Sequence, residues 1–531
     1  MGDRAERLKR ASAAAALGLG LTLSFPFRAG ELAFDAGAVV GWVALLPLAW
    51  LVGRAGPRAA FGWTLAGAAA GYAGVLFWLY VVVTVHGGAA PVFGVAAVGA
   101  VALYFALHAA LAAAVAAWPG WSPRLRAVLV LPAAWVVTEH LRSFDLFGGF
   151  PWAYLGYAGH ADGPLLELAA LGGVWGLSFL LACFAGLLAS GRWRTAVVLL
   201  CAAHLAGFAL RFGRPAEPDP APLRAAVVQA NIPQQIKWDR ELARRHFQAH
   251  LDLTRLVAAG KPLDLVVWPE ASVPVLLEAE PEYRRSVAEL SAETGAVLVL
   301  GGTGLGFSLE SERPRVFNSA FVVTPDAGVV DRYDKTQLVP FGEYVPLRGV
   351  FGAFSAVASG LAGLHDLTPG ESVRRLETRG AVVPRHAPAA LICYELIYPD
   401  LVRRAARSGA GLLLNLTNDA WYGRSSAPHQ FMAIASLRAA ENGLPMLRAA
   451  NTGVSGFIDA GGVVLDQTPI FERRALAGDV PPRRPETLYA RYGDWVVWAS
   501  WGLLLGLGGL GLVGRDRSSR AGDRRGTPPA P

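Results

Sequence analysis

Three side chains of different chemical types could together carry out acyl transfer. A carboxylate, Glu270, follows an apolar run; an ammonium, Lys335, stands among strand and turn signals; and a thiol, Cys393, ends a second apolar run. A thiolate can attack a carbonyl carbon, and a carboxylate can take up the thiol proton. An ammonium can stabilise both the thiolate and the oxyanion of the tetrahedral intermediate. The set therefore predicts a cysteine-dependent acyl transfer.

Cys393 lies where one predicted element changes into another. Residues 389–392 read as a buried strand, and the stretch from Pro399 reads as a helix with a proline in its first turn. A thiol at such an elbow is held rigidly and can point into a cleft. Taken alone, a free cysteine is more often a small buried hydrophobe, and Glu270 or Lys335 alone would more often be a cap or a solvated charge. Only their joint occurrence favours catalysis.

The other reactive residue types provide no competing site. Cys183 and Cys201 fall in apolar runs, so no disulfide framework is expected. The sequence contains no Gly-x-Ser-x-Gly nucleophile elbow and no metal-binding spacing such as Cys-x-x-Cys or His-Glu-x-x-His. We therefore predict neither a metal ion nor a cofactor.

An α/β layered domain is predicted over residues 222–485. It follows a proline-rich linker at 214–222 that marks a domain boundary. Short β-branched runs then alternate with helical patterns, which is typical of such domains. The predicted strands are 225–230, 263–267, 296–300, 317–323, 389–392, 412–416 and 446–449, and the predicted helices are 240–258 and 283–294. Ligand crevices form at the ends of strands in these folds, where the three candidate side chains stand.

The remainder of the chain has the composition of a membrane protein. Of the 531 residues, 53% are hydrophobic and only 17% are charged, which is unusual for a soluble protein. We predict seven or eight spans, near residues 11–27, 37–53, 58–86, 91–118, 126–141, 165–189, 194–212 and 495–513. Residues 1–213 would then form a helical membrane domain of about seven spans, 494–514 a final transmembrane helix, and 515–531 a basic tail.

Basic residues assign an orientation to these spans. Fifteen basic residues fall on the side of the membrane where the N-terminus lies, whereas the short loops on the other side contain only Arg28 and Arg142. These fifteen are Arg4, Arg7, Lys9, Arg10, Arg54, Arg58, Arg124, Arg126, Arg192, Arg194, Arg515, Arg517, Arg520, Arg524 and Arg525. By the positive-inside rule both termini are cytoplasmic, and residues 213–493 lie outside, facing the periplasm if the cell has two membranes. Topology thus explains the net charge of +7, and we predict no nucleic-acid partner.

The motifs around the three side chains resemble the nitrilase superfamily, whose members carry a Glu-Lys-Cys triad on an α-β-β-α sandwich. With its spans, the chain as a whole resembles the apolipoprotein N-acyltransferases, a family that completes bacterial lipoprotein maturation. The motifs that carry this closer resemblance are Gln229-Ala-Asn-Ile-Pro-Gln234, Lys237-Trp238, Trp268-Pro-Glu270, 335–346, Asn415-Leu-Thr-Asn-Asp-Ala-Trp-Tyr-Gly423, Pro428-His-Gln430, Arg438-Ala-Ala-Glu441 and Arg448-Ala-Ala-Asn-Thr-Gly453. The resemblance covers nearly the whole chain.

This resemblance implies a role for each of the three side chains. Glu270 would be the general base, Lys335 would stabilise the thiolate and the oxyanion, and Cys393 would be the nucleophile. The implied reaction moves an acyl chain from a phospholipid to the α-amine of an S-diacylglyceryl cysteine on an apolipoprotein, at the surface of the lipid bilayer. A thioester intermediate predicts ping-pong kinetics, and a single catalytic set makes a monomer sufficient.

Four further residues are implied to lie near the site. Glu343 and Glu395 could orient the lysine or tune the pKa values of the neighbouring groups. Trp238 and Tyr394 match aromatic positions that shape the pocket for the acyl chain or lipid.

An apolar, glycine-rich stretch follows the predicted lysine at residues 348–370 and is too short to span a bilayer. We hypothesise a mobile lid that dips Phe351, Phe354 and Leu361 into the membrane surface and admits an acyl chain. Ordinary core packing is the alternative. Replacing both phenylalanines with serine should slow turnover on vesicle-borne lipid if the lid exists.

Two other functional classes remain open on the sequence alone. A membrane-tethered amidase or nitrilase for small molecules could use the same three side chains, but it gives no reason for the spans. A transporter or scaffold with an inactive domain would leave the complete set of reactive residues unexplained, and its spans carry almost no charge for a substrate pathway.

Overall fold

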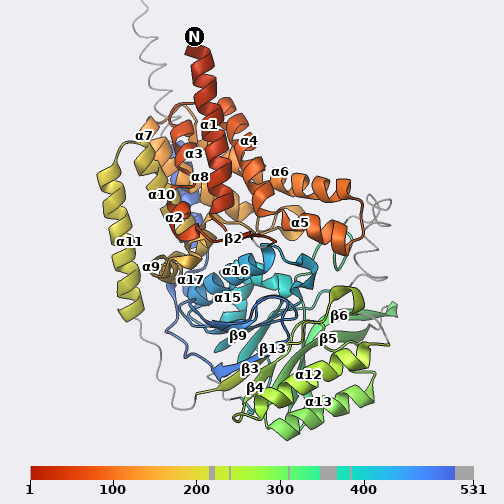
Figure 1. Ribbon diagram of the computed structural model, residues 1–531. Coiled ribbons are helices and arrows are strands. Elements are labelled where there is room, and N and C mark those ends of the chain that lie inside the picture. Colours follow the sequence, from red (N-terminus) through yellow and green to blue (C-terminus); the bar gives the residue numbers. More distant parts are fainter. Residues whose placement is uncertain are drawn as a thin grey trace, which may run out of the picture.

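The computed structural model describes residues 2–30, 32–213, 222–237, 241–308, 311–346, 367–382 and 386–508. Trp238, residues 348–366 of the hypothesised lid, with Phe351, Phe354 and Leu361, and the basic tail lie outside the described residues. Within the described residues, a helical half formed by residues 2–213 lies against an α/β half (Figure 1).

The helical half consists largely of helices that coincide with the apolar runs. Its elements are α1 (Gly2–Leu23), β1 (Phe27–Ala29), β2 (Leu32–Phe34), α2 (Gly37–Val43), α3 (Leu46–Val52), α4 (Pro57–Val75), α5 (Trp78–Val81), η1 (Val82–His86), α6 (Pro91–Ala116), α7 (Pro123–Leu125), η2 (Arg126–Val130), α8 (Leu131–Leu141), η3 (Leu146–Gly148), η4 (Leu155–Ala161), α9 (Gly163–Glu167), α10 (Ala169–Ala189) and α11 (Trp193–Gly213). Proline begins α4 and α6, where its missing N–H costs no hydrogen bond.

Among the described residues, three helices are long and apolar enough to cross a membrane: α6, α10 and α11. The pair formed by α4 and residues 78–86 passes the same test together, although it bends by 55°. The apolar stretches at 37–52 and 495–508 form shorter helices. Length and composition thus support up to four spans, and the arrangement of seven or eight spans stays a prediction.

The α/β half is built from two sheets. One has the strand order β13-β3-β4-β5-β6-β7 and the other the order β12-β11-β10-β9-β8. The strands are β3 (Arg224–Gln229), β4 (Leu265–Val267), β5 (Val297–Ser308), β6 (Ser311–Thr324), β7 (Gly328–Asp334), β8 (Pro388–Ile392), β9 (Leu412–Thr417), β10 (Met446–Ala450), β11 (Gly456–Ile458), β12 (Val464–Gln467) and β13 (Arg474–Asp479). All seven predicted strands are present, while β7, β11, β12 and β13 were not predicted.

Helices cover the outer face of each sheet, which gives the predicted α-β-β-α sandwich. Helices α12 (Ala243–Ala258) and α13 (Pro281–Thr294) pack on the six-stranded sheet. Helices α15 (Pro399–Arg407) and α16 (Ala427–Asn442) pack on the five-stranded sheet, on the side of the helical half (Figure 1). The fold class predicted from the sequence is therefore confirmed.

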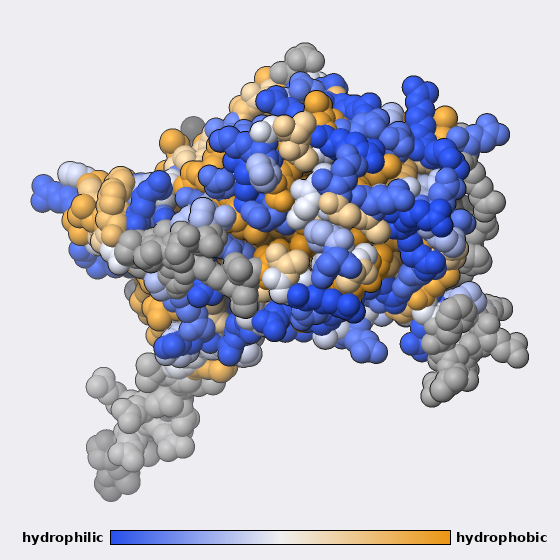
Figure 2. All heavy atoms as spheres, turned by 90° about the horizontal axis from the view of Figure 1, so that it is seen from below, coloured by the Kyte–Doolittle hydropathy of each residue, from blue (hydrophilic) through white to orange (hydrophobic). Residues whose placement is uncertain are grey.

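The alternation of side chains along β3 shows how the six-stranded sheet separates two cores. Ala225 and Val227 face the five-stranded sheet, whereas Ala226 and Val228 belong to a second core with α12 and α13. On the face of the molecule opposite the helical half, many hydrophilic side chains are exposed, with hydrophobic areas between them (Figure 2). This face therefore suits contact with water.

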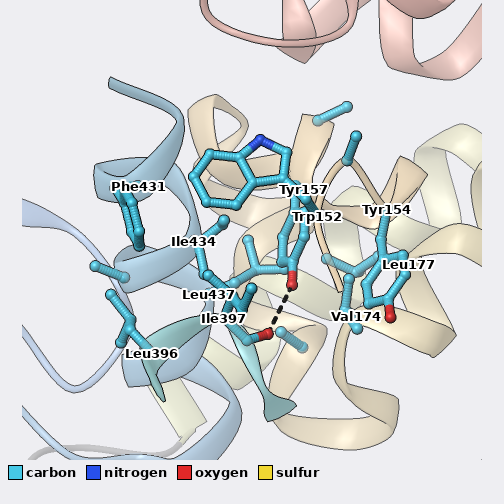
Figure 3. Packing of buried hydrophobic residues seen from close by; sticks show 14 of the residues in the cluster. Trp152, Tyr154, Tyr157, Val174, Leu177, Leu396, Ile397, Phe431, Ile434 and Leu437 are labelled. Carbon is cyan, nitrogen blue, oxygen red and sulfur yellow. Dashed lines mark hydrogen bonds between the residues drawn. The ribbon is translucent and has the colours of Figure 1, made fainter. Parts of the chain in front are cut away.

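The two halves share one continuous hydrophobic core. Trp152 and Tyr157 of the helical half pack with Ile397 beside the nucleophile elbow and with Phe431 of α16 (Figure 3). The Tyr157 hydroxyl also donates to the main-chain oxygen of Ile397 over 3.5 Å. Burial of these large side chains fixes the α/β half on the helices.

A buried amide reinforces the same interface. Gln430 of α16 accepts a hydrogen bond from the Trp152 indole over 2.7 Å. Its amide nitrogen donates to the main-chain oxygens of Pro26 at 3.2 Å and Val75 at 3.1 Å. One side chain thus binds three segments of the helical half, and the α/β half cannot shift without breaking buried hydrogen bonds.

Candidate active site

Cys393 stands immediately after β8, in a backbone conformation that few residues other than glycine adopt. Its φ is 51°, and the short helix η7 (Cys393–Ile397) begins at this residue. The five residues of β8 are all buried, so the strand is fixed where it delivers the thiol. A strained backbone at a reactive side chain is typical of functional sites. The predicted strand-to-helix elbow is present.

Glu270 lies beyond the end of β4 with both carboxylate oxygens engaged. Its Oε1 accepts a hydrogen bond from Asn318 Nδ2 at 2.7 Å, and its Oε2 accepts one from the main-chain N–H of Asn418 at 2.9 Å. The ammonium of Lys335 lies 3.7 Å from the same Oε1. These donors hold the carboxylate in one orientation and leave it only 7% exposed.

Lys335 directly follows β7 and is 1% exposed. Its ammonium donates to Glu343 Oε1 over 2.9 Å. Burial lowers the pKa of Lys335, but the charges of Glu343 and Glu270 outweigh this effect, so the pKa lies above its usual range. The ammonium therefore remains charged at every physiological pH.

Asn318 of β6 joins the two carboxylates. Its amide nitrogen donates to Glu270 Oε1 at 2.7 Å and to Glu343 Oε1 at 2.9 Å. Glu343 is further held by the main-chain N–H of Val339, which donates to Oε2 at 2.8 Å. Because Lys335 contacts both carboxylates as well, the four side chains form a closed ring of charge-assisted contacts.

The thiol of Cys393 is protonated at rest. Burial raises the pKa of Cys393 far above that of a free thiol, and the charge of Glu270 adds to this rise. Lys335 and a hydrogen bond with Thr417 act in the opposite direction. A thiolate must therefore form as the thiol reacts, with a neighbouring base to take its proton.

Glu395 connects the elbow at Cys393 with the loop after Lys335. Its Oε1 accepts hydrogen bonds from the Tyr333 hydroxyl at 2.7 Å, from the Thr336 N–H at 2.7 Å and hydroxyl at 2.9 Å, and from the Gln337 N–H at 3.3 Å. Its Oε2 accepts from the Ile392 N–H at 2.7 Å.

Burial raises the pKa of this fully buried carboxyl, while the hydrogen bonds from Ile392 and Tyr333 oppose the rise. Through its hydrogen bonds to Ile392 and Thr336, the Glu395 side chain acts as a brace that fixes the elbow of Cys393 relative to the loop after Lys335.

Glu395→Gln is expected to destabilise the fold by about 2–4 kcal/mol, because an amide nitrogen cannot accept the hydrogen bonds that the carboxylate oxygen accepts. Denaturant unfolding in detergent would measure the loss. Glu289→Gln, at an exposed position on α13, is the matched control and should change the unfolding free energy by less than about 0.5 kcal/mol. Equal stabilities of the two variants would contradict the brace.

Tyr394 points toward the helical half. Its hydroxyl donates to the main-chain oxygen of Gly149 at 3.3 Å, and the Tyr398 hydroxyl donates to the same oxygen at 2.9 Å. Gly149 has a φ of 86°, and a Cβ there would collide with the main chain of Ser143, so the loop requires glycine. The residue next to the nucleophile is thereby tied to a loop of the helical half.

The sequence motifs converge behind the thiol, although they lie far apart along the chain. Asn418 donates to Gln234 Oε1 at 2.9 Å and accepts from Asn451 at 3.0 Å. Arg448 pairs with Asp419 at 2.7 Å, and Asp419 accepts from the Thr417 hydroxyl at 2.9 Å. These buried contacts fix the ends of β9 and β10 beside the elbow.

The sequence reasoning missed Lys237 as a site residue, although it stood in one of the quoted motifs. Its ammonium is 4% exposed and donates to the main-chain oxygen of Glu270 at 3.1 Å. Burial lowers the pKa of Lys237 to about 8, against the opposing charges of Glu270 and Cys393. A second cation thus stands beside the candidate base and thiol.

Lys237→Met should remove an alkaline decline in the rate of enzyme acylation. The pKa of Lys237, about 8, lies below its usual range, so its positive charge is present at lower pH and is lost as the pH rises through that value. We expect the wild-type rate to fall there because a charge that stabilises the developing thiolate disappears. The variant should be slower by about tenfold below this pH and show no such decline. A wild-type rate that keeps rising would contradict this role.

Among the described residues, no group of three or more histidine, cysteine, aspartate or glutamate side chains is arranged to hold a metal ion.

Comparisons with known proteins relate both halves to described families. The carbon-nitrogen hydrolase family matches residues 224–486, and the apolipoprotein N-acyltransferase N-terminal domain matches residues 17–187. Curated proteins called apolipoprotein N-acyltransferase are 37% identical over 473 residues in Geobacter metallireducens, with 87% of this chain and 88% of the relative covered. The relative from Azotobacter vinelandii is 37% identical over 507 residues, with 90% and 92% covered.

Among solved structures, an amidase from Nesterenkonia sp. aligns with 54% of this chain and 98% of its own, at 20% identity and a TM-score of 0.37. A carbon-nitrogen hydrolase from Helicobacter pylori aligns with 52% of this chain and 92% of its own, at 16% identity and a TM-score of 0.38.

Proposed function

The chain belongs to the family of the apolipoprotein N-acyltransferases, and from this premise we propose how it completes the N-acylation of lipoproteins. The acyl donor is a phospholipid, and the acceptor is the α-amine of the N-terminal S-diacylglyceryl cysteine of an apolipoprotein. The reaction proceeds in two halves through a thioester on Cys393, and one copy of the chain suffices.

In the first half-reaction, Cys393 attacks the ester carbonyl carbon of the phospholipid while Glu270 accepts the thiol proton. The raised pKa of the thiol favours this concerted loss of the proton over a thiolate that exists beforehand. Lys335 stabilises the oxyanion of the tetrahedral intermediate. The intermediate collapses to the thioester, and Glu270 returns the proton to the leaving alkoxide of the lysophospholipid.

In the second half-reaction, the α-amine of the acceptor attacks the thioester carbonyl. Glu270 takes a proton from the amine, and the same proton passes to the departing sulfur of Cys393. The products are an amide on the lipoprotein and the regenerated thiol. A thioester reacts more readily with an amine than the original ester does, which is the advantage of a covalent intermediate.

One observation carries this proposal. Glu270, Lys335 and Cys393 come from three separate strand ends. The ammonium lies 3.7 Å from the carboxylate, and the charges of both groups act on the pKa of the Cys393 thiol. The ring through Glu343 and Asn318 supports the assignment of Lys335 as a fixed cation rather than as the base.

Intact-mass analysis after incubation with a phospholipid of defined acyl chains tests the proposal. We expect the mass of the full chain in detergent to rise by one acyl group, and hydroxylamine should remove this group, as it cleaves thioesters. Cys393→Ala should show no increase. A reactive Cys393 without an acyl adduct would instead favour an amidase for small molecules and overturn the phospholipid donor.

We also propose how the chain is oriented in the membrane and how it is divided into domains. Residues 1–213 and 494–514 lie in the inner membrane, residues 222–485 form the catalytic domain in the periplasm, and both termini are cytoplasmic. The distribution of arginine supports this orientation. Because both substrates are anchored in lipid, a catalytic domain seated on the membrane helices can reach them without their leaving the bilayer.

A further inference from the structure

A pocket lies where the α/β half meets the first hairpin of the helical half. It encloses about 430 Å³. Its lining residues are Arg28, Arg424, His429, Val454, Gln467, Thr468, Pro469, Ile470 and Glu472. None of these has a place in the acyl transfer proposed above.

The walls of this pocket are held firmly. The N–H of Arg28 in β1 donates to the Ser426 hydroxyl at 2.9 Å, which joins the hairpin to the residue before α16. On the opposite wall, Gln229 donates to the main-chain oxygens of Pro469 at 2.8 Å and Glu472 at 3.0 Å. The pocket is therefore formed by both halves and does not depend on a loose loop.

Unpaired basic groups gather in this pocket. In the described part of the chain, the buried Nε of Arg28 and the buried Nε2 of His429 have no hydrogen-bond partner. The Arg424 guanidinium lies over the Phe471 ring, 5.0 Å from its centroid. Glu472 is the one carboxylate in the lining, so the two arginines leave a net positive charge. Buried donors without acceptors are costly, which points to an anionic partner that supplies acceptor oxygens.

His429 can serve as a neutral donor in such a site. Burial and the neighbouring Arg28 lower the pKa of His429, while Asp35 opposes this shift. The imidazole is therefore uncharged at neutral pH, and one of its ring nitrogens carries a hydrogen. Two guanidinium groups and an imidazole form a donor set that suits a phosphate.

The surroundings of the pocket favour a lipid as the source of that phosphate. Arg28 follows the first apolar helix, and the strand paired with β1 presents Leu32 with 62% of its surface exposed. Leu19 of α1 is 61% exposed and Val39 of α2 is 73% exposed. These exposed apolar side chains belong to the hairpin that carries Arg28 and to the two helices that flank it in the chain, which fits an acyl chain with its headgroup at a membrane boundary.

We propose that the pocket between β1, the start of α16 and residues 467–472 binds the phosphate of a phospholipid headgroup. Arg28 and Arg424 hold the phosphate oxygens, and the acyl chains extend along the exposed apolar side chains of α1 and β2. The site is separate from Cys393, and it retains its lipid whether or not that residue is the nucleophile.

Native mass spectrometry of the full chain in detergent tests this site, in a Cys393→Ala background that cannot form a thioester. We expect a phospholipid adduct that weakens at least about tenfold in affinity when Arg28→Gln and Arg424→Gln are combined. Binding of a diacylglycerol with the same chains, which lacks the phosphate, should not change. Arg244→Gln with Arg255→Gln, two arginines of α12 that do not line the pocket, is the matched control and should leave the adduct intact.

Glu472→Gln distinguishes a specific effect on headgroup binding from a loss of binding that is caused by general damage to the fold. Removing the single carboxylate should tighten phospholipid binding by about two- to tenfold, a gain that misfolding cannot produce. Weaker or unchanged binding in Glu472→Gln would overturn the proposal, as would equal loss in the double variant and its α12 control. Glycerophosphate without acyl chains should compete poorly; if it binds as tightly as the lipid, the site belongs to soluble phosphates and the lipid assignment fails.

Discussion

Cys393→Ser is expected to lose turnover by about 10⁴-fold or more while the protein stays folded. The hydroxyl of serine is a far weaker acid than a thiol, and burial and Glu270 already raise the pKa of the thiol at this position. Proton transfer to Glu270 would therefore become the barrier. Serine is close to cysteine in size and meets the same backbone requirement at a φ of 51°.

Single-turnover release of lysophospholipid would measure this loss, and thermal unfolding would verify the fold. Cys183→Ser and Cys201→Ser are the controls, because these thiols lie in α10 and α11, away from the elbow. Both should retain turnover within about threefold. If Cys393→Ser keeps a tenth of the wild-type rate, the covalent mechanism is wrong.

Lys335→Met should lower the rate of enzyme acylation by about 10³-fold or more. It should also lower the stability of the fold. The variant removes the cation that Glu270 and Glu343 share, so two carboxylates joined through Asn318 remain in a buried site. Breaking a buried ion pair on one side costs about 3–5 kcal/mol.

The pH dependence distinguishes this lysine from Lys237. Because the pKa of Lys335 is raised above its usual range, its stabilising charge is fully present at neutral pH and is lost only as the pH rises through that raised value. Lys335→Arg, which keeps the charge but not the shape, should recover stability more than activity. A Lys335→Met variant that forms the thioester at the wild-type rate would exclude the oxyanion role.

Much of the α/β half could be predicted because its central strands are buried on both faces. The residues of β8, β9 and β10 are all buried and mostly apolar, with Asn415, Thr417 and Arg448 as the exceptions, so these strands stand out in the sequence. Strand β12 is largely exposed, β13 is mostly half-buried, and β11 has only three residues, so their sequence patterns are too weak to predict strands. Glu270 and Cys393 were found since each follows a buried strand.

The partners of these residues could not be found in the same way. Asn318 lies inside β6, and its contact with two carboxylates depends on how the sheet brings β6 beside β7. Lys237 resembles any lysine after a turn, and only its burial against Glu270 reveals it. Glu395 could be placed near the site, but its hydrogen bonds to Ile392 and Thr336 depend on the packing of distant segments.

The core shared by Trp152, Tyr157 and α16 has a consequence for how the molecule can be divided. A soluble version cut at residue 213 would expose the face of α16 and the residues behind the nucleophile, which the helical half now covers. We therefore expect heating to melt both halves in one calorimetric transition, and the isolated catalytic half to aggregate. In this architecture the helices are part of the folding unit, and neither portion is a module that can be exchanged.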